Sequence, residues 1–408
     1  MMTQTAAKGK RRSRRLRLHP CKRLDMSWAD WFFAAARSLK NAARLPGRRS
    51  AKAEAPADGD ALVCLTVRSA FDLYLQARDW PPGGEIVFAG LTVPDMPRIA
   101  QERGLRPVPL DIDPLTAEWS AEALKRSVGP QTRAVVLTHL FGAKVEIEPS
   151  LETARRAGAA VVEDCAQAYR GQGWLGHPEV DISLFSFGPM KTATALGGAV
   201  ARVQRPDIRE RMAQIQSGYP LQPAGEYLRR VLLCGLMLAG SNPTAYGVLS
   251  ALAEAAGADR EALLHRFTRN VPPDELWARL RRRPCAALLA VLARRLSQGE
   301  ALFERRRRLG RKLFEAAGPE APIPTRHALD HAFWMIPLLV EDAAAAKRLF
   351  RAHGFDAVSN RLYPAPGARA AGAERVAEAV YLPFDPRMSE REMERLGALV
   401  KRHFRQSQ

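Results

Sequence analysis

Two neighbouring stretches, AVVEDCAQAYRGQ at residues 160–172 and DISLFSFGPMKTATALGGA at 181–199, decide the fold of this chain. Each begins with, or just before, a short apolar run that is typical of a buried strand. Asp164 stands where the first run ends, and Lys191 lies in the loop beyond the second. Paired glycines at 197 and 198 then allow a tight turn into a further strand. Because open α/β proteins place their ligands at the carboxyl ends of strands, we expect the acid and the amine at one edge of a sheet.

An acid and a lysine in these positions are the two groups that a pyridoxal phosphate (PLP) enzyme requires. The lysine amine holds the cofactor aldehyde as a Schiff base, and the carboxylate keeps the pyridine nitrogen protonated so that the ring can accept electrons. Gln167 follows Asp164 closely enough to hydrogen-bond the phenolic oxygen, and Ser186 ends the second strand, where it can bind the phosphate. These residues predict a PLP site with Lys191 as its reactive group.

The order ED-x-A-Q-A, S-F-x-x-x-K and G-G resembles the DegT/StrS family of PLP-dependent sugar aminotransferases, which belong to fold type I, the aspartate aminotransferase class. The resemblance continues upstream through LTVRSAFDLYL (65–75) and RAVVLTHLFG (133–142). Downstream it reaches AVYLPFDPRMSEREMERL (379–396). It covers residues 61–408, apart from an inserted segment in the middle of the chain.

This resemblance implies a mostly parallel seven-stranded α/β sheet flanked by helices, with a small C-terminal α/β domain. It also implies a homodimer whose sites form at the subunit interface. By the same resemblance, Lys191 would form the Schiff base, Asp164 would contact the pyridine nitrogen and Gln167 would contact the ring oxygen. The expected phosphate ligands are Ser186 and the turn formed by Val67, Arg68 and Ser69. That turn opens a helix, and free N–H groups at a helix N-terminus attract anions.

Strand signals alternate with helical stretches up to residue 163, as in a parallel sheet that has helices on both faces. The expected strands are 62–65, 86–89, 107–111, 134–138, 159–163, 182–186 and 197–203. The last two, joined through the loop of Lys191, are expected to form an antiparallel addition. The predicted divisions are a basic N-terminal arm with an amphipathic helix (1–60), a PLP-binding large domain (61–216), a helical insertion (217–280), and a connecting helix with the small domain (281–408).

The middle of the chain departs from the family pattern. An N-x-R segment usually lines the neighbouring subunit's site, but this chain has Arg281-Arg282-Arg283-Pro284 there. The insertion at 217–280 is either a lobe packed on the body or a lid or membrane-facing surface for a lipid-like or lipid-linked acceptor. Val93 stands in the segment that usually stacks an aromatic ring or a histidine on the pyridine. These differences point away from an ordinary nucleotide-sugar substrate.

Positive charge is concentrated at the N-terminus. The formal net charge is +19, of which residues 1–52 contribute +13. Ser27 and Asp30 form a capping-box-like helix start. One face of that helix is expected to carry Trp28, Trp31, Phe32, Ala35 and Leu39, and the other Arg37, Lys40 and Arg44. The segment is either a disordered basic arm or an anchor on an anionic membrane surface. Nucleic acid is an unlikely partner, because no groove-reading motif is present.

The remaining motifs mostly exclude other classes of protein. Five scattered cysteines lack the spacing of a metal or disulfide framework, so we expect no metal and a reducing cytoplasm. The chain has neither a signal-peptide core nor the ~20 apolar residues that cross a bilayer. GQGWLG at 171–176 matches a dinucleotide-binding pattern, but no helix is expected to follow, so we interpret it as a turn. His139 is expected to pack within a turn, without a catalytic role.

The sequence therefore predicts an aminotransferase that moves an amino group from a donor such as glutamate to a keto-sugar or related carbonyl. Two alternatives stay open. One is a PLP- or PMP-dependent sugar dehydratase, although family dehydratases replace the lysine by histidine. The other is a non-catalytic, membrane-associated regulatory relative.

Overall fold

The computed structural model describes residues 17–43, 60–257, 275–328, 330–359, 362–365 and 371–407. Arg44 and the parts of the predicted arm and insertion outside these ranges lie outside the described residues.

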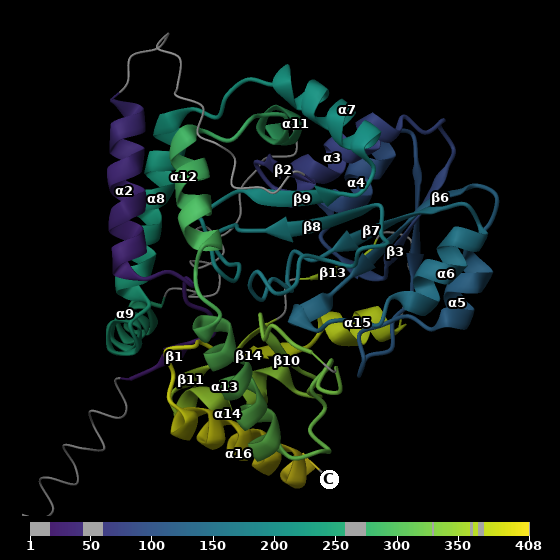
Figure 1. Ribbon diagram of the computed structural model, residues 1–408. Coiled ribbons are helices and arrows are strands. Elements are labelled where there is room, and N and C mark those ends of the chain that lie inside the picture. The colour runs from purple at the N-terminus through teal and green to yellow at the C-terminus, as the bar shows by residue number, and fades with distance from the viewer. Residues whose placement is uncertain are drawn as a thin grey trace, which may run out of the picture.

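A seven-stranded sheet forms the centre of the molecule (Figure 1). Its strands, in spatial order, are β2 (Ala61–Cys64), β9 (Ala199–Val203), β8 (Ile182–Ser186), β7 (Ala160–Asp164), β6 (Thr132–Thr138), β3 (Glu85–Ala89) and β5 (Arg106–Leu110). The strands from β8 to β5 pair in parallel, whereas β9 runs antiparallel to both β8 and β2. The predicted mostly parallel α/β sheet is therefore confirmed, and its antiparallel element is β9.

Helices cover both faces of this sheet, which explains why its central strands are continuous apolar runs. One face packs against α3 (Val67–Arg78), α4 (Asp95–Glu102), α7 (Pro206–Ser217) and the short α11 (Leu276–Leu280). The other face packs against α5 (Ala121–Ser127) and α6 (Glu148–Arg156). The connection from β7 to β8 contains turns and no helix, so the GQGWLG segment is not a dinucleotide-binding turn.

The C-terminal part forms the expected small α/β domain. Its sheet has the order β10 (Ile336–Leu338), β14 (Val380–Leu382), β12 (Val358–Ser359). Its helices are α13 (Ala301–Ala317), α14 (Ala343–Ala352), α15 (Ala371–Ala377) and α16 (Glu390–Ser407). The strand β13 (Tyr363–Pro364) pairs with β4 (Leu91–Thr92) of the large domain. A buried apolar cluster at this junction joins the two domains.

Residues 17–43 are an integral part of the fold, so the prediction of a separate arm is wrong for them. The strand β1 (His19–Pro20) pairs with β11 (Phe355–Asp356) of the small domain. The helix α2 (Trp28–Ala42) has the expected cap, in which Ser27 Oγ accepts the N–H of Asp30 at 3.1 Å. It packs against α8 (Ala224–Gly240) and α12 (Ala286–Leu296) (Figure 1). Ion pairs hold α2 in this position, because Asp30 pairs with Arg294 and Arg295 of α12.

The insertion contributes two helices, α8 and α9 (Pro243–Ala255), as predicted. One side of α8 contacts the loop after β8, since the Tyr227 hydroxyl donates to the Ala195 carbonyl at 2.8 Å. Among the described helices, none is long and apolar enough to cross a membrane alone. The pair α8 and α9 reaches that length and composition together, but it is bent by 92°.

Candidate functional site

The lysine loop, residues 187–198, connects β8 to β9 and carries Lys191. The Lys191 N–H donates to the Gly188 carbonyl at 3.0 Å, which turns the chain directly after Ser186. A Cβ atom placed on Gly188 would lie 3.9 Å from both Ser186 Oγ and Lys191 Cγ. The two predicted site residues therefore border one space. Ala193 and Leu196 have φ values of 52° and 60°, a left-handed conformation that costs free energy in residues other than glycine and is frequent at functional sites.

Asp25, from the N-terminal segment, holds the strained part of the lysine loop. Its Oδ2 accepts the Ala193 N–H at 2.9 Å and pairs with Arg306 of α13 at 3.1 Å. Asp25 and Arg306 are both buried. Sequence reasoning assigned Asp25 to an arm and missed this contact, for which the sequence carries no local signal.

The amine of Lys191 lies over an indole ring. Its Nζ is 4.3 Å from the centre of the Trp334 ring, and Trp334 Nε1 donates to the Met190 carbonyl at 2.8 Å. Burial lowers the pKa of Lys191 to about 8, with the Asp164 carboxyl opposing the shift and the Arg68 charge adding to it. A lysine with this pKa is partly neutral near physiological pH and can act as a nucleophile.

A second lysine, also missed in the sequence, lies at the same indole. Lys22 Nζ is 4.0 Å from the centre of the Trp334 ring and donates to the Trp334 carbonyl at 3.0 Å. Burial, followed by the charges of Arg306 and Lys191, lowers the pKa of Lys22 well below its usual value. The site thus gathers several cationic side chains around one carboxyl, which suits an anionic ligand.

Asp164 ends β7 and lies one strand away from Ser186, because β7 and β8 are adjacent and parallel. Its Oδ1 accepts the Ala166 N–H at 2.9 Å. Burial raises the pKa of Asp164, against the lowering influence of the Ala166 N–H and the charges of Lys191 and His139. A cationic partner near this carboxyl would favour its ionised form.

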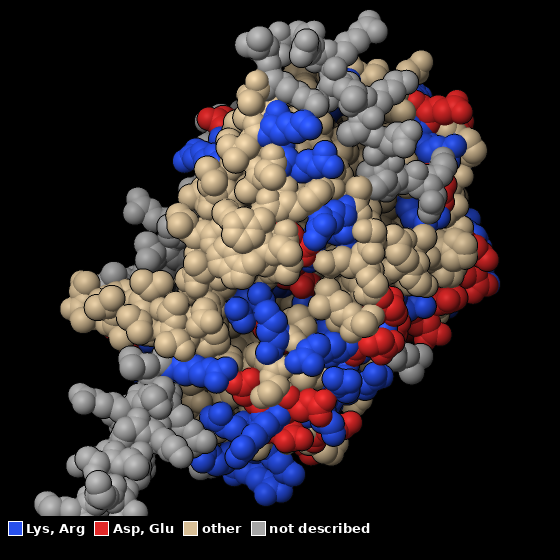
Figure 2. All heavy atoms as spheres, turned by 60° about the vertical axis from the view of Figure 1, so that its left-hand side comes forward, with Lys and Arg blue, Asp and Glu red and all other residues tan. Residues whose placement is uncertain are grey.

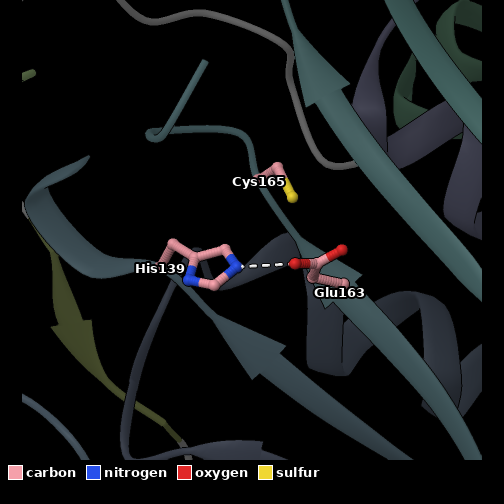
Figure 3. Close-up of side chains that lie close together, drawn as sticks. All are labelled: His139, Glu163 and Cys165. Atoms are coloured by element: carbon pink, nitrogen blue, oxygen red, sulfur yellow. Dashed lines mark hydrogen bonds and ion pairs between the residues drawn. The ribbon is translucent and has the colours of Figure 1, made fainter. Parts of the chain in front are cut away.

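A buried hydrogen-bond network supports the strand end behind Asp164 (Figure 3). His139 Nε2 lies 2.9 Å from Glu163 Oε1, and His139 Nδ1 accepts the Val145 N–H at 3.1 Å. Glu163 Oε2 accepts from the Ser183 hydroxyl at 2.6 Å and from the His177 N–H at 2.9 Å. Burial raises the pKa of Glu163, but these hydrogen bonds and the charge of His139 outweigh it and lower the pKa overall.

His139, Glu163 and Cys165 bring possible metal-ligand atoms within 4.8 Å of one another. Both ring nitrogens of His139 and both oxygens of Glu163 already have hydrogen-bond partners. The arrangement therefore serves as packing and hydrogen bonding at the ends of β6 and β7. This agrees with the sequence interpretation of His139 as a packed histidine.

Gln167 is oriented so that it can donate to a ring oxygen. Its Oε1 accepts the Phe141 N–H at 2.7 Å, which leaves the amide nitrogen as the end that can donate to a ligand. Phe141 itself has a φ of 59°, and Gly142, with a φ of 97°, comes close to Trp334. This turn therefore brings Gln167 and Trp334 to the same edge.

The N-terminus of α3 offers a phosphate-binding turn next to the lysine loop. The Gly198 N–H donates to the Leu65 carbonyl at 3.0 Å, which fixes the turn beside that loop. Thr66 Oγ1 accepts the Ser69 N–H at 3.0 Å. The predicted ligand Ser69 thus uses its N–H within the protein, whereas Val67 and Arg68 provide the first helical N–H groups that an anion can approach. The Arg68 guanidinium is ion-paired with Asp95.

The three arginines that replace the expected N-x-R segment make contacts within their own chain. Arg281 pairs with the buried Asp72 at 3.0 Å, and Arg282 pairs with Glu226 at 2.8 Å. Arg283 donates to the Tyr219 carbonyl at 2.9 Å. Val93, in the segment expected to supply a stacking ring, is exposed just before α4.

A cavity of about 350 Å³ lies elsewhere. Its lining includes Tyr169, Phe187 and Arg202 but none of the predicted site residues. The candidate site is the sheet edge, where the structure gathers Asp164, Lys191, Ser186, Gln167 and the α3 turn, together with the unpredicted Lys22, Asp25, Thr66 and Trp334.

This set fits PLP. The half-buried amine of Lys191, with its lowered pKa, suits an aldehyde, the carboxyl of Asp164 suits a protonated ring nitrogen, and the α3 turn suits a phosphate.

Sequence comparisons cover part of the chain. A sequence profile described as the DegT/DnrJ/EryC1/StrS aminotransferase family matches residues 59–234. GDP-perosamine synthase of Caulobacter vibrioides is 32% identical over 173 residues, 41% of this chain and 45% of that protein. The pleiotropic regulatory protein of Geobacillus stearothermophilus is 31% identical over 140 residues, 33% of this chain and 37% of that protein. The chain thus matches less than half the length of these relatives.

Structural similarity extends over nearly the whole chain. A sugar aminotransferase from Micromonospora echinospora has a TM-score of 0.66 and 21% identity, covering 94% of this chain and all of its own (100%). A putative sugar aminotransferase from Streptococcus pneumoniae in its PLP form has a TM-score of 0.67 and 14% identity, covering 95% and 98%. Such similarity shows the fold type I architecture. Residues 59–234 of the chain thus match the DegT/DnrJ/EryC1/StrS aminotransferase family in sequence, and nearly the whole chain has the fold of sugar aminotransferases.

Proposed function

We propose that this protein is a PLP-dependent aminotransferase that moves an amino group from a donor such as glutamate to a keto-sugar or related carbonyl compound. The observation that carries the proposal is the half-buried Lys191 amine, with a pKa of about 8, on a strained loop beside the carboxyl of Asp164. A buried lysine with a lowered pKa next to a specific charged partner is a functional-site signature.

Each predicted residue has a defined part in this proposal. Lys191 would hold the cofactor through Nζ, and Asp164 would accept the hydrogen of the ring nitrogen. Gln167 would donate to the ring oxygen, while Ser186 and the N–H groups of Val67 and Arg68 would bind the phosphate. PLP, when bound, supplies an aldehyde and an electron-accepting ring.

Proton transfer from the amino donor would then depend on side chains of the protein. Nζ of Lys191 is the base that takes a proton from the α-carbon of the amino donor, because an amine with a pKa near 8 is a competent base at neutral pH. The Trp334 indole and the Lys22 side chain limit where that amine can move, because the Nζ atoms of Lys22 and Lys191 both lie over the Trp334 ring.

Two further features of the proposal follow from the class. We expect a homodimer, because fold type I sites form between subunits. A reducing cytoplasm is the expected compartment, in agreement with five free, buried cysteines. A regulatory, non-catalytic protein is the second candidate, favoured only by the printed name of the Geobacillus relative.

The absorption spectrum of the PLP-reconstituted protein tests the proposal. We expect a band near the visible edge that the Lys191→Ala variant lacks and that Lys401→Ala, a substitution of an exposed lysine on α16, retains. Adding glutamate should remove the band, and a keto-sugar should restore it. A colourless protein after reconstitution would favour the regulatory candidate, and a band that glutamate leaves unchanged would exclude glutamate as the donor.

A further inference from the structure

We propose that the protein docks on an anionic lipid bilayer through an apolar face formed by α2, α8 and α9. This inference is independent of the proposed reaction. The apolar face is defined by nine exposed side chains: Trp28, Phe32 and Leu39 of α2, Leu232, Leu233 and Leu236 of α8, and Val248, Leu249 and Leu252 of α9.

The face concentrates apolar surface that soluble proteins normally scatter. It holds nine of the thirteen large apolar side chains that are exposed among the described residues. Leu236 is 72% exposed, and Phe32 and Leu252 are each 62% exposed. The three helices are in contact, α2 with α8 and α8 with α9. Figure 2 shows this side of the molecule as a broad tan area with Lys and Arg side chains at its border.

The helices α8 and α9 of this face contain a long segment without charged residues. Residues 231–253, which form most of α8 and α9, include no Asp, Glu, Lys or Arg. The other side of α8 is occupied, because Trp31 packs on Gly235 and donates to the Val231 carbonyl at 2.8 Å. The exposed leucines are therefore fixed outward by the packing behind them.

The charges around the face suit anionic headgroups. Arg37 and Lys40 of α2 and Arg229 of α8 are exposed, and none of them has an ion pair with a described acid. Arg229 lies one turn before Leu232 and Leu233, on the same side of α8. The acid nearest in sequence to the exposed α9 side chains, Glu254, is paired with Arg351 at 2.6 Å.

A polybasic segment enters the fold beside α9. The sequence has seven Lys or Arg residues between positions 8 and 17. It joins the described chain at Arg17, and the next residue, Leu18, donates its N–H to the Pro243 carbonyl of α9 at 2.9 Å. Basic residues next to an exposed apolar surface add electrostatic attraction to the burial of apolar groups in the interface.

A second copy of the chain suits the face less well than a bilayer. Pairing two apolar faces would bring the exposed Arg37, Lys40 and Arg229 of each copy close together. Like charges in a desolvated contact oppose association. Anionic lipid satisfies both the apolar and the basic parts of the surface.

Flotation of the full-length, PLP-reconstituted protein with vesicles tests the proposal. We expect it to bind vesicles of phosphatidylcholine and phosphatidylglycerol at least tenfold more strongly than phosphatidylcholine alone. The double variant Leu236→Glu, Leu252→Glu should lose at least tenfold in binding. Leu115→Glu, in which an exposed leucine outside the face (49% exposed) is changed, should bind like the wild type. Replacing Arg11, Arg12, Arg14 and Arg15 by Gln should remove the preference for phosphatidylglycerol.

A second measurement locates the contact without a destabilising change. Lipids brominated in their acyl chains should quench part of the tryptophan fluorescence, and Trp28→Phe should remove the quenched part. Absence of wild-type binding, or binding by the double variant equal to the wild type, would overturn the proposal. A protein that is dimeric in solution, becomes monomeric in the double variant and ignores vesicles would overturn it in favour of a second copy.

Discussion

Two regions of this molecule present groups that a globular protein normally pairs or buries, and they do so with opposite chemistry. At the carboxyl edge of the sheet, the amine of Lys191, the carboxyl of Asp164 and the N–H groups that open α3 face a common space. On the flank, charges such as Asp30 are paired inside and leucines face outward. The first region suits a small polar, anionic ligand and the second an extended apolar surface. Each region can be broken by substitutions that leave the other intact.

The largest effect is expected at the sheet edge, from Asp164→Asn. This change keeps the shape of the side chain but removes the charge opposite the ring nitrogen, so kcat/KM should fall about 10³-fold. Because Asp164 raises the pKa of Lys191, the variant should also lower it below about 8. The rate of PLP capture by the cofactor-free protein should then rise with pH through a lower midpoint than in the wild type. Equal midpoints would show that Asp164 does not act on Lys191.

On the flank, Asp30→Ala should cost about 3–5 kcal/mol of unfolding free energy, because it leaves the buried guanidinium of Arg295 without its carboxylate. Arg295 is only 1% exposed. Urea unfolding measures the change. The matched control is Asp207→Ala, which breaks an exposed pair with Arg205 and should change the unfolding free energy far less, because water screens that pair. If the two variants lost similar amounts of unfolding free energy, burial would not determine how much these ion pairs stabilise the protein.

Asp25 joins the two regions, so its substitution tests whether the flank positions the catalytic loop. Asp25→Ala removes the acceptor of the strained Ala193 N–H and should reduce kcat/KM about 10- to 100-fold through misplacement of Lys191. Asp25→Asn retains an oxygen acceptor for that N–H and should stay closer to the wild type. A role limited to stability would lower the melting temperature of Asp25→Ala without changing its pH profile of PLP capture.

The smallest effect concerns a pair of acids near the ends of β3 and β6. Burial first, and then the charge of Glu146, raises the pKa of Glu118 to about 7. The folded protein therefore binds this proton more tightly than the unfolded chain between pH 4.5 and about 7, and stability falls as pH rises through that window. Glu118→Gln should recover about 1 kcal/mol at pH 8 and little at pH 4. An equal gain at both pH values would exclude titration as the cause.

The sheet and the side chains that stand at its strand ends could be predicted because their signals are local. Short apolar runs followed by Asp164, Ser186 and Lys191 specify both the strands and the side chains at their ends. The parallel pairing of β7 with β8 then brings those ends together. Gln167 was predictable for the same reason, since it lies three residues beyond a strand end.

The second half of the site could not be predicted, because its residues meet across the whole chain. Lys22 contacts Trp334, and Asp25 contacts both Ala193 and Arg306. The basic composition of residues 1–52 favoured an exposed arm, yet Asp25 and Asp30, the acids in that segment, anchor it to buried arginines. The net charge of a segment does not show which of its acids form ion pairs with distant residues. The amphipathic pattern of α2 predicted a helix correctly, but Trp31 and Ala35 face the protein while Trp28, Phe32 and Leu39 face outward.

The strand β1 and the residues that follow it have a consequence for synthesis. Lys22 and Asp25 are synthesised well before their partners Trp334 and Arg306, which lie 312 and 281 positions later. Contacts of such separation form late, because the intervening chain must be ordered first. The lysine loop, which precedes Arg306 and Trp334 in the chain, therefore lacks its fixed geometry until these residues of the C-terminal part have been made.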